Sequence, residues 1–397
     1  MRRDYHRDRL TWAAFAGLLA FGFLNAVLGP ALPYLRAEEH ISYVVGALHQ
    51  VAFAIGGGLA GLLAARWEGG PGRGTTIRVG LTGAAIVGLG VGYGDAVVVT
   101  VTAAFLVSLL ATSALVRMWA VLADAHGERR TVAMAEGEVA VSLGGIVTPL
   151  LVGGLAATAL TWRFSFVAGG VIVAVAALAM GTVRVPRPAP RPAMPPRPAG
   201  TRAHRLRLPP TLVVVLAIVA LEFGLSFWLA SYLNDGVSLD RGLAVVMVSG
   251  LYAANLVGRV VTSRLARRIT TEGLLAASLI LALIGVCVLL AARDAPVAGI
   301  GIALAGVGVG AMFPLTSSLH VGVSGRNADG AIGQVLSIAA IGQIVGPLAA
   351  GAIAESAGLR AGLLVLPALV LLAAAALARY PSQARSHARA QLETAPG

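Results

Sequence analysis

The feature of this sequence that most limits its fold is a succession of long apolar stretches. A helix that crosses a lipid bilayer needs about 20 mostly apolar residues. Twelve stretches of that kind follow one another, near residues 10–35, 41–66, 76–94, 97–122, 131–156, 162–182, 210–234, 242–266, 272–292, 296–320, 330–355 and 360–379. They predict an all-α membrane protein with 12 transmembrane helices.

Composition supports a membrane protein and argues against an enzyme. Of the 397 residues, 57% are hydrophobic and only 12% are charged, whereas about 25% are charged in an ordinary soluble domain. All 30 basic residues are arginine, which excludes lysine-dependent nucleotide binding and Schiff-base chemistry. The single Cys287 excludes an intrachain disulfide and a paired-cysteine metal motif. We therefore expect no catalytic site, cofactor or bound metal.

The placement of arginine predicts how the chain is oriented. If the N-terminus is inside, the outside segments hold only Arg36, Arg163, Arg241, Arg293 and Arg360, and most other arginines lie inside. This asymmetry follows the positive-inside rule, so both termini are expected in the cytoplasm. The net charge of +12 then faces anionic lipid head groups, and no nucleic acid partner is needed. A chain rich in Ala, Gly and Arg and without Lys is typical of a GC-rich bacterium, which predicts a bacterial cytoplasmic membrane.

A low-complexity segment separates two sets of six spans. Residues 183–209 are rich in proline and arginine and predict an extended cytoplasmic linker. We expect an N-terminal six-helix bundle at 1–182, a C-terminal six-helix bundle at 210–380 and a cytoplasmic tail at 381–397.

The two bundles are expected to be pseudo-symmetric. The fifth span contains SLGGIVTPLLVGGLA and the eleventh contains AIGQIVGPLAAGAIA, which align without gaps and pair Pro149 with Pro347. Internal repeats that enclose a substrate site at their interface are common in transporters.

Polar side chains are sorted unevenly among the spans. The central parts of spans 3, 6, 9 and 12 carry no charged residue and no Asn, Gln or His, whereas the other eight carry such groups. Ionisable residues within a bilayer are energetically costly and mark functional sites. Every third helix is therefore expected to face lipid, and the other eight can face water.

Three carboxyl groups are candidates for proton coupling. Glu222 lies near the middle of span 7, where it either binds and releases a proton or serves as a protonated structural residue. Glu136 and Glu138 lie on different faces of span 5, so the two cannot point the same way, and the sequence leaves open which faces the cavity. One of them is expected to pair with Arg117, or with Arg129 or Arg130.

Amide and aromatic side chains near mid-depth are candidates for substrate binding. Amides can hydrogen-bond a neutral hydroxylated solute while an aromatic face stacks on it. The alternative role is helix–helix hydrogen bonding, which is worth about 0.6 kcal/mol in membranes. The candidates are Asn25, Gln50, Trp228, Tyr252, Asn255 and Gln343.

The 12 spans, the long middle segment and this sorting of polar residues resemble the major facilitator superfamily. The segment GLLAARWEGGPGR, Gly61 to Arg73, is similar to the signature loop of that family. It keeps Gly61 and Arg66 but has Ala65 in place of the family's aspartate. The resemblance implies peripheral helices 3, 6, 9 and 12 and alternating access through eight others. It also implies a cytoplasmic gate, to which we assign Gly61, Arg66, Arg73, Arg117, Arg129 and Arg130.

Two spans, LEFGLSFWLASYL and GVGVGAMFPLTSSLH, look most like the fucose-permease-like sugar branch of the family. In the family's antiporter motif of helix 5, Thr148 and Val152 replace two glycines, which argues against drug efflux. We therefore predict a monomeric secondary active transporter that uses the proton-motive force to take up a small polar, sugar-like solute. The alternatives are a proton-driven exporter of amphipathic compounds and a membrane sensor or enzyme that does not transport.

Overall fold

The computed structural model describes residues 6–66, 72–185, 208–324 and 328–380, which are almost entirely helical. Counting α1 with α2 and α11 with α12, these residues form 11 long apolar spans, and α14 adds a shorter apolar helix, which confirms the predicted fold class. Most of the predicted linker, 183–209, and all of the tail, 381–397, lie outside the described residues. The elements are α1 (Arg9–Ala26), α2 (Leu28–Glu39), α3 (Tyr43–Arg66), α4 (Arg73–Tyr93), α5 (Val97–His126), η1 (Gly127–Arg129), α6 (Arg130–Ala156), α7 (Phe164–Gly181), α8 (Pro210–Ser231), η2 (Tyr232–Gly236), α9 (Arg241–Leu265), α10 (Thr271–Ala291), α11 (Ala295–Val309), α12 (Met312–Val323), α13 (Ala328–Gly362) and α14 (Val365–Leu377).

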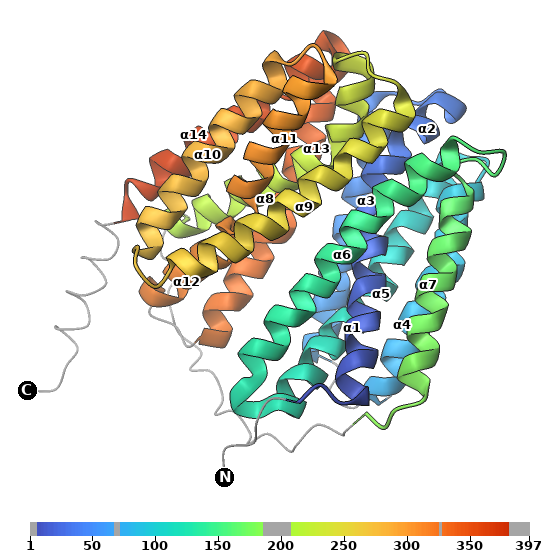
Figure 1. Ribbon diagram of the computed structural model, residues 1–397, viewed down its shortest axis with the longest axis vertical. Helices are drawn as coiled ribbons and strands as arrows, with labels where there is room; N and C mark the ends of the chain where they lie inside the picture. Colours follow the sequence, from blue (N-terminus) through green and yellow to red (C-terminus); the bar gives the residue numbers. More distant parts are fainter. Residues whose placement is uncertain (1–5, 67–71, 186–207, 325–327, 381–397) are drawn as a thin grey trace, which may run out of the picture.

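The helices form two halves that meet toward one end of the molecule (Figure 1). Helices α1–α7 make one half and α8–α14 the other, and the halves touch where α6 packs on α9, α3 on α13 and α2 on α8. We call the end at which α1 begins and α7 ends the lower end, and the opposite end the upper end. The halves lie together toward the upper end and diverge toward the lower end.

Prolines shape the first crossing where it passes the middle of the molecule. Helix α1 ends at Ala26, and α2 continues the crossing from Leu28. Pro30 and Pro33 have no N–H, so they cannot donate to the carbonyls of Ala26 and Gly29, four residues earlier. Two backbone acceptors at mid-depth are therefore left without their usual helical donors.

The tenth crossing is interrupted in the same way. Helix α11 ends at Val309, and α12 begins at Met312. Pro314 has no N–H to donate to Gly310, and the carbonyl oxygen of Gly310 instead accepts from Nε of Arg259 at 3.0 Å. The break in this crossing thus fixes the position of a charged side chain within the membrane.

Glycines let equivalent helices of the two halves approach closely. A Cβ atom added to Gly22 of α1 would lie 2.0 Å from the carbonyl oxygen of Val141 on α6. In the other half, a Cβ atom on Gly346 of α13 would lie 2.0 Å from the carbonyl oxygen of Ala220 on α8. Close backbone contact through small residues is how helices associate in membranes.

Each half also contains a contact between a threonine and a histidine near the lower end. The hydroxyl of Thr11 in α1 lies 2.8 Å from Nε2 of His126 at the end of α5. The hydroxyl of Thr211 in α8 lies 2.8 Å from Nδ1 of His320 in α12. These contacts join the first and fourth crossings of each half, in line with the internal repeat.

In each half, an arginine near the upper end donates a hydrogen bond to the end of another helix. Arg163, just before α7, donates to the carbonyl of Gly92 at the end of α4. Arg360, which precedes α14, donates to the carbonyl of Leu290 at the end of α10, at 2.8 Å. The sixth and third crossings are thus connected in both halves, which favours movement of each half as a unit.

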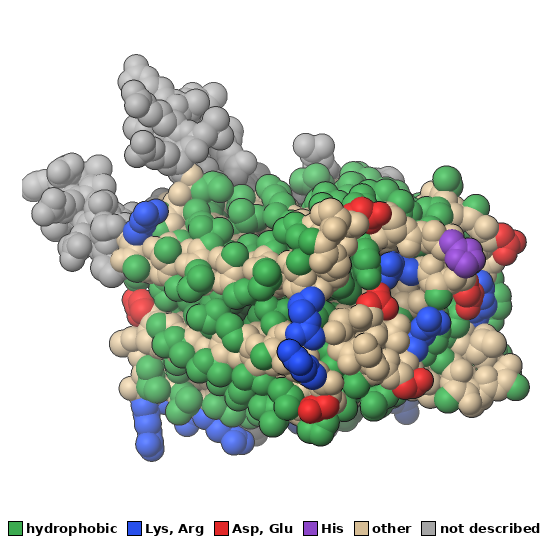
Figure 2. Space-filling view, turned by 90° about the horizontal axis from the view of Figure 1, so that it is seen from above, with side chains coloured by type: hydrophobic (Ala, Val, Ile, Leu, Met, Phe, Trp, Pro, Cys, Tyr) green, Lys and Arg blue, Asp and Glu red, His purple; other side chains and the backbone are tan. Residues whose placement is uncertain are grey.

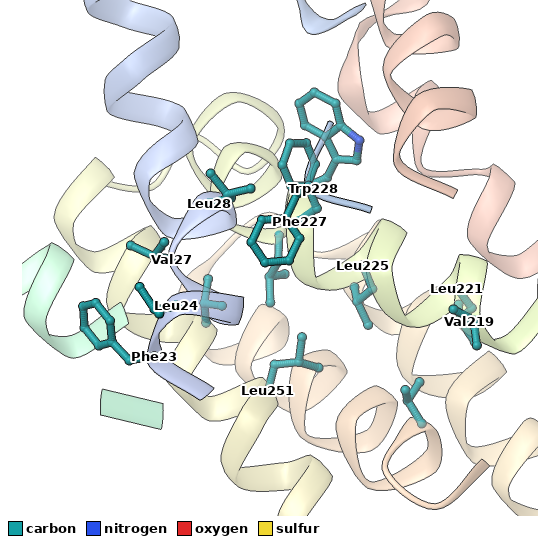
Figure 3. Close-up of a cluster of buried hydrophobic side chains, with 14 of the residues drawn as sticks. Phe23, Leu24, Val27, Leu28, Val219, Leu221, Leu225, Phe227, Trp228 and Leu251 are labelled. Atoms are coloured by element: carbon teal, nitrogen blue, oxygen red, sulfur yellow. The ribbon is translucent and has the colours of Figure 1, made fainter. Parts of the chain in front are cut away.

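Apolar side chains from both halves pack together in one buried cluster at the junction between the halves (Figure 3). Leu24 and Leu28 come from the first crossing, Phe227 and Trp228 from α8, and Leu251 from α9. All five are almost completely buried. This packing holds the first crossing of one half against the first crossing of the other.

Candidate functional site

A small polar cavity lies where α1, α2, α3, α8 and α9 meet between the halves. Its volume is about 40 Å³, which accommodates a few water molecules. It brings together five residues that the sequence singled out, from four different helices. The cavity is lined by Asn25, Ala26, Gly29, Gln50, Glu222, Phe223, Ser226, Phe227, Tyr252 and Asn255.

Glu222 contributes the carboxyl group of this cavity. It lies 12 residues beyond Pro210, the first residue of α8, which places it about 18 Å along the helix and so near the middle of a bilayer. Its side chain is partly buried. The charged side chains that act on it electrostatically are those of Arg259 and Glu138. A carboxyl group with these neighbours is suited to gaining and losing a proton.

Gln50 of α3 supplies an unused hydrogen-bond donor to the cavity. The residue is only 4% exposed, and its Nε2 atom has no hydrogen-bond partner among the described residues. Buried polar groups are nearly always hydrogen-bonded in folded proteins. An unpaired amide on the wall of a polar cavity is therefore available to a bound solute or to water.

The amide of Asn255 has a structural role as well as a place on the cavity wall. In the orientation that satisfies both of its polar atoms, its nitrogen donates to the carbonyls of Gly306 at 2.8 Å and Leu251 at 3.3 Å. The helix–helix contact predicted as the alternative role is thus present between α9 and α11. Its oxygen has two lone pairs and can also accept a hydrogen bond from a solute hydroxyl.

Arg259 and Glu138 form an ion pair between the halves. Nη1 of Arg259 on α9 lies 2.7 Å from Oε2 of Glu138 on α6. Their side chains are 34% and 49% exposed, so water reaches the pair. Arg259 follows Tyr252 and Asn255 at helical spacings, which places it on the cavity face of α9, closer to the lower end. Sequence reasoning did not assign Arg259, although an arginine within an apolar span was the signal.

Glu136 points away from that interface. Its two carboxylate oxygens accept from Nε and Nη2 of Arg7 at 2.8 and 2.6 Å, a bidentate arrangement. The two glutamates of α6 therefore have different partners, and Glu138 is the one that faces the other half. The sequence did not identify either arginine as the partner.

Two other substrate-binding candidates lie outside the wall of this cavity. Trp228 is fully buried, and its Nε1–H donates to the carbonyl of Pro347 on α13 at 2.9 Å. Gln343 is a partly buried residue of the same helix. In this conformation Trp228 joins α8 to α13 and does not present a face to the cavity.

The candidate gate residues lie near the lower end. Arg73, at the start of α4, pairs with Asp124 near the end of α5 at 2.6 Å, a partner that sequence reasoning missed. Gly61 lies in the last two turns of α3, and the side chain of Arg66 is outside the described residues. Arg117 is a partly buried residue of α5, whereas Arg129 and Arg130 are exposed at the start of α6.

A polar cluster closes the interface at the upper end. Oδ2 of Asp235 accepts from Nη1 of Arg36 and from the hydroxyl of Tyr43, both at 3.0 Å and both across the two halves. The carboxylate of Glu355 also accepts from the backbone N–H of Val44 at 3.3 Å. Figure 2 looks onto this end and shows arginine and acidic side chains close together on a largely uncharged surface.

Two helical halves around a polar midplane cavity define a secondary transporter. The sequence matches the Major Facilitator Superfamily over residues 14–332, and the chain therefore belongs to that family. Families of this kind move solutes across membranes, so the protein is an integral, multi-pass membrane transporter. None of the curated proteins compared with the chain matches it.

Solved structures share this fold over nearly the whole chain. A bacterial homologue of the human lysosomal transporter Spinster, inward-facing and occupied, is 16% identical, with a TM-score of 0.73 and coverage of 95% of this chain and 96% of that one. A D-xylose–proton symporter is 15% identical, with a TM-score of 0.70 and coverage of 94% and 97%. The nucleoside transporter NupG is 10% identical, with a TM-score of 0.71 and coverage of 95% and 100%. Identities this low establish the fold alone.

Proposed function

We propose that the protein takes up a small polar, sugar-like solute together with protons by alternating access. The observation that carries the proposal is the midplane cavity, in which the carboxyl group of Glu222 stands among amide, hydroxyl and carbonyl groups. The membrane is a bacterial cytoplasmic membrane, and the arginine-rich lower end faces the cytoplasm, as the positive-inside rule predicts. The conformation is then closed to the outside at Asp235.

Glu222 carries the proton in this proposal, and Arg259 links its charge to the contact between the halves. Arg259 is held by Gly310 and Glu138, and its positive charge also acts on Glu222. An ionised Glu222 competes with Glu138 for this arginine, whereas a protonated Glu222 leaves the arginine to Glu138. Loading the proton therefore changes the strength of an ion pair that joins the two halves.

Hydroxyl groups of the solute bind to the polar groups of the wall. Gln50 offers an N–H donor, and Asn255 offers an acceptor oxygen. The carbonyls of Ala26 and Gly29 are further acceptors, because the prolines of α2 cannot donate to them. A solute that brings several hydroxyls can satisfy all of these groups. A cavity of about 40 Å³ must widen to admit it.

The second candidate is proton-driven export of amphipathic compounds. Two phenylalanines, Phe223 and Phe227, line the cavity beside Glu222, and aromatic faces bind apolar or cationic groups. An exporter uses the same proton-binding carboxyl group but moves solute and proton in opposite directions.

The experiment that tests the proposal is solute-triggered proton movement in proteoliposomes containing a pH-sensitive dye. A panel of sugars, polyols, organic acids and amphipathic cations is applied to vesicles of known protein orientation. Import predicts that a sugar or polyol enters together with protons. Proton movement opposite to that of an amphipathic compound would establish export. If folded protein responds to no solute in the panel, the proposed solute class is wrong.

A further inference from the structure

An apolar groove of about 460 Å³ lies between α10 and α14, away from the central cavity. These helices are the ninth and twelfth crossings, the pair expected to face lipid. Small residues create the groove, namely Gly273 and Ala276 on α10, Ala374 on α14 and Ala378 directly after α14. The two helices pack against each other. Because these side chains are small, the groove between the helices stays open where larger side chains would fill it.

The groove has the length of one leaflet of a bilayer. On α10 it extends from Glu272 to Leu283, and at a rise of 1.5 Å per residue this distance is about 16 Å. Half of the hydrocarbon core of a bilayer is about 15 Å thick. The groove therefore runs from the lower end of the helix pair to the middle of the membrane, which matches a single extended acyl chain.

The lower mouth of the groove is polar, unlike its walls. Glu272 in the first turn of α10 and Tyr380 after α14 line this mouth together. Burial and the negative charge of Glu272 raise the pKa of the Tyr380 hydroxyl, so it stays protonated. The exposed side chains of Arg267 and Arg268 lie at the same end, between α9 and α10. A carboxylate beside a hydroxyl suits a primary ammonium group, and arginines nearby suit a phosphate.

We propose that this groove is a binding site for one phospholipid with a primary-amine head group, phosphatidylethanolamine being the example. One acyl chain lies in the groove between α10 and α14. The ammonium group donates to Glu272, and the phosphate lies toward the arginines. The site is separate from the transport cavity and does not depend on the solute that the protein carries.

The test is native mass spectrometry of the full-length protein with equal amounts of phosphatidylethanolamine, phosphatidylcholine and phosphatidylglycerol that have identical acyl chains. The protein is expected to retain one phosphatidylethanolamine in preference to the other two lipids. Glu272→Gln is expected to reduce that preference by about 3- to 10-fold, because the carboxylate no longer pairs with the ammonium group. Circular dichroism and the thermal midpoint of the variant in detergent serve as the check of folding, because they require no solute.

The acyl-chain contact is tested by matched substitutions on one helix. Ala374→Leu fills the groove, whereas Ala375→Leu changes the exposed neighbour, which does not line it. The first variant is expected to lose the retained lipid and the second to keep it. Ala276→Leu and Ala277→Leu form the same comparison on α10, should a variant of α14 not fold.

Three results would overturn the proposal. Equal lipid retention by the groove-filling variants and their controls would show that the chain does not lie there. Equal binding of the three lipids, or preference for phosphatidylglycerol, would remove the role of Glu272. Conversion of a dimer to a monomer by Ala374→Leu, with lipid retention unchanged, would show that a second copy of the protein covers the groove.

Discussion

Asp235→Asn is expected to weaken closure of the upper end by a calculable amount. Asp235 accepts two hydrogen bonds across the halves, from Arg36 and from Tyr43, each at 3.0 Å. A hydrogen bond to a charged group contributes about 1.5–3 kcal/mol when it is buried, and an exposed ion pair contributes about 0.2–1 kcal/mol. The side chains of Arg36 and Asp235 are 15% and 34% exposed, which lies between these two cases. We therefore expect the two hydrogen bonds of Asp235 together to stabilise the closed upper end by about 1–2 kcal/mol.

This free energy belongs to the conformation in which the upper end is closed, because the bonds join the two halves. Losing about 1–2 kcal/mol changes the ratio of closed to open molecules by a factor of about 5–30. The substitution keeps the side chain's size, and Arg36 still lies over the ring of Tyr43, 3.7 Å from its centre. The expected effect is therefore a shift of populations and not unfolding.

Electron paramagnetic resonance distances between the halves measure that shift. Spin labels are placed at exposed positions of the upper end, Leu160→Cys in one half and Arg293→Cys in the other, after replacement of Cys287. The population with the longer distance is expected to grow in the Asp235→Asn variant. Glu38→Gln is the control, since Glu38 pairs with Arg163 in its own half at 2.5 Å. Unchanged distances in the Asp235 variant, or an equal change in the control, would refute the role of this cluster in closure.

Two further predictions concern stability. Gly346→Val is expected to destabilise the protein by about 1–3 kcal/mol or more, because its Cβ atom would meet the carbonyl oxygen of Ala220. Gly154→Val is the control, because a Cβ atom there meets open space, and its thermal midpoint in detergent should stay close to that of the wild type. Equal thermal midpoints for the Gly346 and Gly154 variants would contradict the packing argument. Asp8→Ala removes the N-cap of α1 and is expected to cost about 0.5–2 kcal/mol at pH 7. Burial alone would raise the pKa of Asp8, but the hydrogen bonds from Thr11 outweigh burial and lower it. The stability difference between wild type and variant should therefore be fully present above about pH 4 and shrink as the pH falls further. A difference that does not depend on pH would show that the charge of Asp8 is irrelevant.

The crossings and much of the cavity wall could be predicted because both depend on local sequence. Apolar length specifies a crossing, and the cost of burying a polar group in lipid directs that group inward. Asn25, Gln50, Tyr252, Asn255 and Glu222 therefore meet in one cavity, although they lie on four helices. Prolines also indicate in the sequence where carbonyls lose their helical donors.

The pairing of charges could not be predicted in the same way. Which arginine reaches Glu138 depends on how the two halves dock, and nothing local to α6 points to Arg259 on α9. The role of Trp228 could not be predicted either, because an aromatic ring in an apolar helix can face a cavity or another helix. Its N–H bonds to Pro347, a choice that the packing of α8 on α13 determines.

Glu222→Gln in proteoliposomes tests the central claim, that this carboxyl group couples proton and solute. The measurement compares uphill solute uptake driven by a proton gradient with solute exchange at equal concentrations, which requires no net proton movement. The variant is expected to lose uphill uptake and proton movement but to keep exchange. Uphill uptake at the wild-type rate in the variant would contradict the claim.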